Sequence, residues 1–148
     1  MKKKELSNEE LMILHRHWMW ANICRISFDK ELLKIENQDQ TVDINPTRFF
    51  VDRVGAFMCM WYGLLYSVLE EILNRKPSIK GLECSGEIIN ELRLFRNAVF
   101  HPQKKYWTDK LFKLIGKKDS ATRIREIHSA LGSFFLEEIK NREERKEE

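Results

Sequence analysis

Residues 54–69 form a run of sixteen residues without a charged side chain, and this run constrains the fold more than any other feature. It lies within a longer stretch in which apolar side chains recur every three or four residues. They are Phe50, Val54, Phe57, Trp61, Leu64, Val68 and Ile72. This spacing predicts one long helix from Asn45-Pro46 to about Arg75. Because both faces of its middle are apolar, we expect this helix to be buried on more than one side, against the rest of a bundle or a second subunit.

Another long helix is expected near the start of the chain. Ser7, followed three residues later by Glu10, is typical of a capping box, in which each side chain accepts a hydrogen bond from the backbone N–H of the other residue. Apolar residues then keep a helical period up to about Glu36. They are Leu11, Leu14, Trp18, Ile23, Ile26, Leu32 and Ile35. The polar segment that follows, NQDQTVD, has the composition of a turn.

Three more helical stretches follow the run at 54–69. They cover about 86–100, from Thr108 or Asp109 to Gly116, and from about 121 to past 140. The middle one is short, and the charged tail at about 141–148 is expected to fray. The sequence has no internal repeat and no strand-like alternation of useful length. We therefore predict one all-α domain over 1–148, with four main antiparallel helices in an up-and-down bundle plus a short extra helix.

Several classes of protein are disfavoured by the sequence. Cys24, Cys59 and Cys84 show no CxxC or Cys/His spacing, which favours free thiols in a reducing cytoplasm over disulfides or a zinc site. The uncharged run is shorter than the roughly 20 residues that span a bilayer, and no apolar run of a signal peptide follows the first lysines. No phosphate-binding glycine loop is present. We expect a cytoplasmic protein with no membrane segment, metal or other cofactor.

The helix expected over 86–100 carries an arginine where apolar residues are expected. Arg96 lies four residues after Leu92 and next to Phe95, at the edge of the apolar stripe. A guanidinium there needs a partner, because burying an unpaired charge is strongly destabilising. The partner is either a carboxylate of the preceding helix, with Glu70 and Glu71 as candidates, or an external anion.

The same helix ends at a histidine followed by a proline. In a regular helix His101 would lie about 140° around the axis from Arg96. The residue before a proline is disfavoured in helical geometry, however, so His101 can leave the helix before Pro102 and turn back toward Arg96. A structural interpretation stays open, in which Arg96 forms an ion pair and His101 caps a helix C-terminus, where a cation is favourable.

Arg96, Asn97 and His101 resemble the signature of the HEPN family of small all-α domains. The family pattern is an arginine, four to six residues and then a histidine, often with a polar residue directly after the arginine. Here the gap is four residues, and Asn97 supplies the polar residue. The predicted order of helices over about 7–140 is also similar to the family's four-helix core with an extra short helix.

This resemblance implies a metal-independent ribonuclease that forms a homodimer, so that two Arg–His pairs meet in one cleft. His101 would act as acid or base, since histidine exchanges protons near neutral pH. Arg96 would hold the phosphate with a bidentate fork and balance charge in the transition state. Asn97 would orient the histidine or bind a phosphate oxygen. DNA, which lacks the attacking 2′-hydroxyl, is expected to stay uncut. By analogy, the biological role would be that of a toxin, a defence protein or an RNA-processing enzyme, with an antitoxin or another protein as partner.

Basic residues follow the motif directly. The formal net charge of +3 is too small to indicate nucleic-acid binding by itself. Lys104 and Lys105 are nevertheless candidates for contacts with RNA phosphates, and Tyr106 and Trp107 either stack on bases or anchor the loop to the core. Two other classes of function stay open: a non-catalytic helical dimerisation or binding module, and a DNA- or nucleotide-binding protein without turnover.

Overall fold

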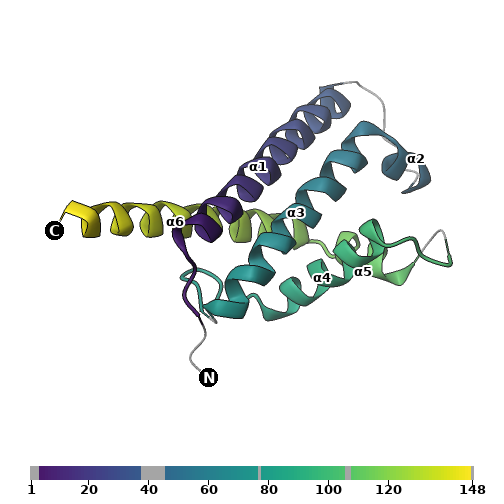
Figure 1. Ribbon diagram of the computed structural model, residues 1–148. Coiled ribbons are helices and arrows are strands. Elements are labelled where there is room, and N and C mark those ends of the chain that lie inside the picture. Colours follow the sequence, from purple (N-terminus) through teal and green to yellow (C-terminus); the bar gives the residue numbers. More distant parts are fainter. Residues whose placement is uncertain (1–3, 38–45, 77, 106–107, 148) are drawn as a thin grey trace.

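The computed structural model describes residues 4–37, 46–76, 78–105 and 108–147 (Figure 1). Every regular element within these ranges is a helix, which confirms the predicted all-α class. In chain order the helices are α1 Asn8–Asn37, α2 Pro46–Val51, α3 Arg53–Arg75, α4 Gly86–Phe100, α5 Asp109–Ile115 and α6 Ser120–Glu147.

Helix α3 lies at the centre of the fold. It packs along α1 and also contacts α2, α4 and α6, and Figure 1 shows it between α1 and α4. Trp61, Leu65, Leu69 and Ile72 are among its fully buried residues, so the predicted burial on more than one side is confirmed within one chain. By length and apolar composition alone α3 could cross a membrane, and half of the stretch concerned is buried inside the fold. The expected cytoplasmic location stays a prediction.

The single helix predicted from Pro46 to Arg75 is wrong in one respect, because it is interrupted at Asp52. This residue has extended backbone angles, φ −81° and ψ 163°, and separates α2 from α3. Helix α2 folds back onto the first turn of α3, so closely that a Cβ added to Gly55 would lie 1.9 Å from the carbonyl oxygen of Phe49. Only a glycine permits this approach. The spacing of apolar residues continues through the break and does not reveal it.

Helix α1 begins as predicted but is apolar on two faces. The backbone N–H of Ser7 donates to Glu10 Oε2 at 2.8 Å, and that of Glu10 donates to Ser7 Oγ at 3.1 Å, which confirms the capping box. Leu11 and Phe28 are buried against the core, whereas Ile23 is exposed. The apolar stripe predicted for the first helix therefore mixes a core face with an outer face.

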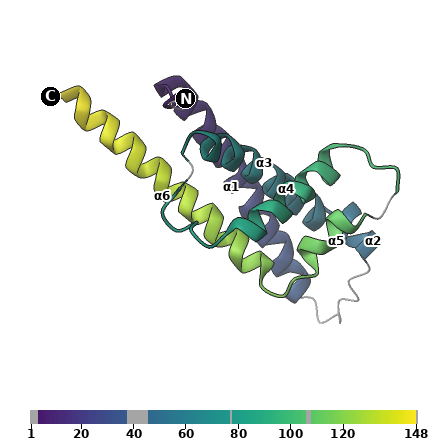
Figure 2. The same cartoon turned by 90° about the horizontal axis from the view of Figure 1, so that it is seen from below.

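The C-terminal part of α6 extends beyond the other helices (Figures 1 and 2). It continues as helix through Glu147, past the point at about residue 141 where we expected the chain to fray. Arg142 lies on this part and donates hydrogen bonds to Asn8 Oδ1 at 2.7 Å and to the carbonyl of Leu6 at 2.9 Å. These bonds join the last helix to the start of the chain.

Candidate functional site

Arg96, on α4, is ion-paired to α3. Its Nη2 donates to Glu70 Oε2 at 3.2 Å and lies 3.5 Å from Oε1. Its guanidinium carbon is 4.9 Å from the centre of the Tyr66 ring, and the Tyr66 hydroxyl donates to Glu70 Oε1 at 3.3 Å. Tyr66 and Glu70 lie one turn apart on α3, so they present an aromatic face and a carboxylate to the same guanidinium. Of the two predicted carboxylate partners, the structure selects Glu70.

The contact with Glu70 uses only part of the guanidinium. The Arg96 side chain keeps 23% of its surface exposed, and its Nε is buried without a hydrogen-bond partner among the described residues. Because a guanidinium carries five N–H donors, Arg96 retains donors for a further acceptor. The adjacent carboxylate offsets part of the positive charge that an incoming anion would meet.

His101 stands at the end of α4 with its side chain exposed. Its backbone angles, φ −112° and ψ 117°, are extended, which confirms that the residue before Pro102 leaves helical geometry. Its backbone N–H still donates to the carbonyl of Asn97 at 3.0 Å, and Gln103 Nε2 donates to the carbonyl of His101 at 2.6 Å. These bonds fix the turn and leave the imidazole at the surface.

The structure does not bring Arg96 and His101 into contact within one chain. No hydrogen bond joins the two side chains in the ranges that the structure covers, and the guanidinium lies against α3 while the imidazole faces outward. The half-buried Asn97 contributes its main-chain carbonyl to the turn. A meeting of these groups therefore needs a second molecule or a movement of the turn.

Basic side chains continue the surface beside His101. Lys104 and Lys105 are exposed, and neither forms an ion pair with another described residue. Their charges are available to an anion, and their expected contacts with RNA phosphates stay a prediction. Tyr106 and Trp107 lie outside the described residues, so their expected stacking or anchoring role is not addressed.

An apolar surface adjoins the same end of α4. Phe100, directly before His101, is 44% exposed. One edge of its ring lies so close to α3 that a Cβ added to Gly63 would be 2.0 Å from it. Met60, one turn before Gly63, is exposed as well. Exposed apolar side chains of α3 and α4 therefore lie near the end of the helix at which His101 stands.

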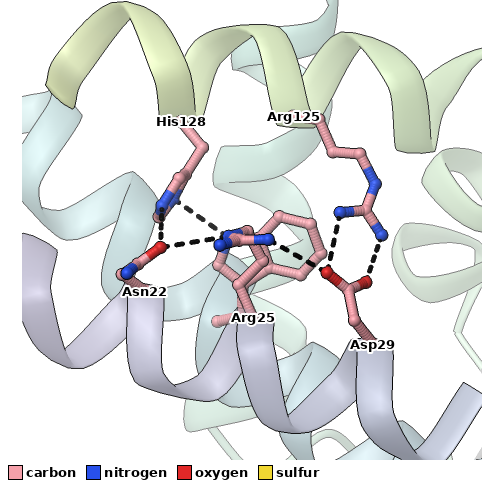
Figure 3. Close-up of polar contacts among 6 residues, drawn as sticks. Asn22, Arg25, Asp29, Arg125 and His128 are labelled. Atoms are coloured by element: carbon pink, nitrogen blue, oxygen red, sulfur yellow. Dashed lines mark hydrogen bonds and ion pairs between the residues drawn. The ribbon is translucent and has the colours of Figure 1, made fainter. Parts of the chain in front are cut away.

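A second polar cluster, which the sequence did not reveal, lies between α1 and α6 (Figure 3). His128 is 4% exposed. Trp61 Nε1 donates to its Nδ1 at 3.2 Å, so Nδ1 is unprotonated and Nε2 carries the hydrogen. His128 Nε2 donates in turn to Asn22 Oδ1 at 3.0 Å, and the main-chain carbonyl of His128 accepts a bond from Trp18 Nε1 at 3.1 Å. Both ring nitrogens of His128 therefore form hydrogen bonds inside the protein, as Figure 3 shows.

Two arginines extend this cluster along α1 and α6. Arg25 donates to Asn22 and to Asp29, at 3.1 and 3.0 Å, and Arg125 donates to both oxygens of Asp29, at 2.5 and 3.2 Å. Burial, followed by repulsion from Arg25 and Arg125, lowers the pKa of His128 to about 4. His128 is therefore neutral at physiological pH and has a structural role. The polar residues 22, 25 and 29, spaced three and four apart on one helix, were the sequence signal for it.

The described residues contain no group of three or more His, Cys, Asp and Glu side chains placed to hold a metal ion. Cys24 and Cys59 are half-buried and Cys84 is exposed, all three as free thiols. Burial raises the pKa of Cys59 to about 12.

Comparison of the chain with models of protein families, with curated proteins and with solved structures finds no match.

Proposed function

We propose that this protein is a metal-independent endoribonuclease similar to those of the HEPN family, with Arg96 and His101 as its catalytic pair across a homodimer cleft. The observation that carries the proposal is the end of α4. There the residue before Pro102 leaves the helix with its side chain exposed, directly after the exposed Phe100. Lys104 and Lys105 follow in the chain, are exposed and form no ion pair with another described residue. We also propose that the four main helices are arranged as the antiparallel up-and-down bundle that the resemblance implies.

The chemistry follows from these side chains. In one step, the ribose 2′-oxygen bonds to the adjacent phosphorus, and the bond from phosphorus to the 5′-oxygen of the next nucleotide breaks. The products are a 2′,3′-cyclic phosphate and a free 5′-hydroxyl. One His101 takes the proton of the 2′-hydroxyl, and His101 of the second protomer donates a proton to the departing 5′-oxygen. Two copies are needed because a single imidazole cannot accept and donate in the same step.

Arg96 would stabilise the charge that grows on the phosphate oxygens. Its N–H groups that do not face Glu70 are the donors available for this purpose. Lys104 and Lys105 would hold the flanking phosphates, and such contacts weaken as salt increases. Asn97, at the base of the turn, would keep the His101 backbone in place through the carbonyl that it already offers.

A second function is favoured by one specific observation. The ion pair of Arg96 with Glu70 and its position over Tyr66 give the arginine a complete structural role inside the fold. A helical binding module without catalysis would need this contact as much as an enzyme would. In that case Arg96 joins α4 to α3, and His101 is an ordinary surface residue.

The two functions are separated by RNA cleavage assays in EDTA. We compare wild-type protein with His101→Ala and Arg96→Ala, and use Arg93→Ala as a matched control because Arg93 bonds only to Asn90 of its own helix among the described residues. Loss of a general acid–base group lowers the rate by about 100- to 10,000-fold. Circular dichroism spectra and melting curves establish that each variant is folded.

The enzyme predicts that His101→Ala and Arg96→Ala abolish cleavage while Arg93→Ala retains it. It also predicts that replacing the 2′-hydroxyl at the cleaved linkage by hydrogen protects the RNA. Wild-type protein that leaves structured and unstructured RNAs intact supports the binding module. The same conclusion follows if cleavage survives in His101→Ala.

A further inference from the structure

The outer face of α1 carries an unusual concentration of exposed apolar side chains. Thirteen large hydrophobic residues are exposed in the described part of the chain, and seven of them belong to this helix. They are Met12, Ile13, Met19, Trp20, Ile23, Ile26 and Leu33. Single exposed apolar residues are normal, but a contiguous group on one helix indicates a surface that is covered by a partner.

The exposed residues follow the spacing of a coiled coil. Met12, Met19, Ile26 and Leu33 recur every seven residues, and Arg16, Ile23 and Lys30 lie four residues after the first three of them. Alternation of four and three keeps a seam on one side of a helix that packs against another helix at a small angle. The seam covers 22 of the 30 residues of α1, which is three heptads. A partner of the same length and spacing would fit it.

We propose that this face binds the same face of a second copy of the chain, with the two α1 helices antiparallel. The charged positions of the seam favour this orientation. Arg16 and Lys30 both occupy the position that meets itself in a parallel pair, so a parallel dimer would place each of them against an identical charge. In an antiparallel pair these positions meet the apolar ones.

In the antiparallel register that we propose, Met19 faces Ile23 of the second copy, and each charged side chain of the seam can reach water. This register places Arg16 across from Ile26 and Lys30 across from Met12, where the long aliphatic stems cover apolar surface and the charged ends reach water. It also brings Lys30 next to the exposed Glu9 of the second copy, one turn before Met12.

The available area is sufficient for a stable dimer. The seven side chains are about half exposed. With about 200 Å² for a fully exposed large side chain, they offer roughly 700 Å² on each copy, close to the roughly 800 Å² per partner of a standard interface.

This inference does not rest on the proposed function. In the described residues α1 makes no contact with α4, because α3 lies between them (Figure 1). A dimer through α1 therefore leaves the surface around His101 free, and the pairing of two His101 side chains under the proposed function would use a second, separate contact between copies. The two proposals are tested by different measurements. Light scattering coupled to gel filtration measures the mass and tests the α1 dimer, whereas RNA cleavage tests the proposed function.

The first test is the mass of the full chain at tens of micromolar. We expect at least twice the 17.8 kDa of one chain for the wild type, and four times that mass if the copies also pair at the His101 surface. Ile23→Lys, at the centre of the seam where the side chain is 59% exposed, should weaken dimerisation at least about 10-fold, because in this register the added lysines of the two copies lie about one turn apart and repel each other. Leu136→Lys is the matched control, since Leu136 is 74% exposed on α6 and away from the seam.

A wild type that is monomeric overturns the inference. So does a dimer that survives Ile23→Lys but dissociates in Phe100→Lys, because that result places the interface beside His101. A monomer that binds anionic phospholipid vesicles and loses this binding in Ile23→Lys would assign the face to a lipid surface instead, which also overturns the proposal.

Cross-linking tests the orientation. In a Cys84→Ser background, which removes the exposed native thiol, Met12→Cys chains mixed with Lys30→Cys chains should form a disulfide-linked dimer on mild oxidation. Met12→Cys alone should not. A disulfide between two Met12→Cys chains at the same rate would show parallel helices and refute the register.

Discussion

The buried His128 makes the stability of this protein depend on pH in a window that can be calculated. Its pKa is about 4 in the folded chain, because burial and the two arginines disfavour the charged form. Its ordinary value is 6.5. Between these two pKa values His128 binds a proton in the unfolded chain but not in the folded chain. The free energy of unfolding therefore falls as the pH decreases from about 6.5 to about 4.

The magnitude follows from the difference between the two pKa values. At about 1.36 kcal/mol for each pKa unit, the full loss of unfolding free energy is about 3 kcal/mol. About 2 kcal/mol of this is lost by pH 5, where the folded chain is still mostly unprotonated at His128. The hydrogen bonds of His128 give the same direction. If Nδ1 were protonated, its hydrogen would face the N–H of Trp61, and the hydrogen bond that Trp61 donates to Nδ1 would be lost.

The assay is urea unfolding followed by tryptophan fluorescence at pH 7.5, 6.5, 5.5 and 5. The informative quantity is the change in unfolding free energy between pH 7.5 and pH 5, compared among variants. His128→Gln is expected to be less stable than wild type at pH 7.5, yet to lose about 2 kcal/mol less on acidification. His101→Gln, with its exposed side chain, should retain the wild-type pH dependence.

Carboxylates contribute at lower pH and are shared by all three proteins. Glu10, for example, has its pKa lowered by the backbone N–H of Ser7, so its stabilisation is lost as the pH falls through that lowered pKa. Such contributions cancel when the variants are compared. If the unfolding free energies of wild type and His128→Gln fell equally between pH 7.5 and pH 5, His128 would not be a buried histidine that is neutral in the folded chain.

Two further stability predictions concern one buried charge and one close backbone contact. Glu91 is 4% exposed and is paired with Lys117 at 2.5 Å, so Lys117→Met should lower the unfolding free energy measured in urea titrations, because it leaves a buried carboxylate without its cation. Adding Glu91→Leu should recover most of the loss. Gly55→Ala should cost about 1–3 kcal/mol, since its Cβ would collide with the Phe49 carbonyl. Gly86→Ala, with no atom within 4 Å of the added Cβ, should cost nothing in the same thermal melts; an equal loss in both would contradict the collision.

The periodicity of apolar residues was sufficient to predict the main helices, because these helices bury apolar residues at the helical spacing. It failed where the decisive contact was between backbones. The interruption at Asp52 depends on the approach of α2 to Gly55, and no side chain in the apolar stripe records it. Periodicity also could not separate the two faces of α1, since Leu11 and Ile23 are equally apolar although one is buried and the other exposed.

The polar interior was missed for a different reason. A single histidine beside Ile127 gives no sign in the sequence of the residues that His128 contacts. Its hydrogen-bond partner Asn22 is 106 residues away in the chain. Only the packing of α6 on α1 brings the two together, and that packing is decided by apolar residues elsewhere. A buried polar group is thus predictable from sequence mainly when both partners lie on one helix.

At the end of α4, the sequence left the partner of Arg96 open between a carboxylate of the preceding helix and an external anion. An arginine on an apolar stripe requires an anion, and the structure supplies one within the chain as Glu70. The need for an external phosphate therefore cannot be inferred from Arg96 alone. Among the described residues that follow His101, Lys104 and Lys105 are exposed and form no ion pair. An RNA phosphate would be attracted first by these lysines, and it would gain a strong contact with Arg96 only by sharing the guanidinium with Glu70 or displacing it.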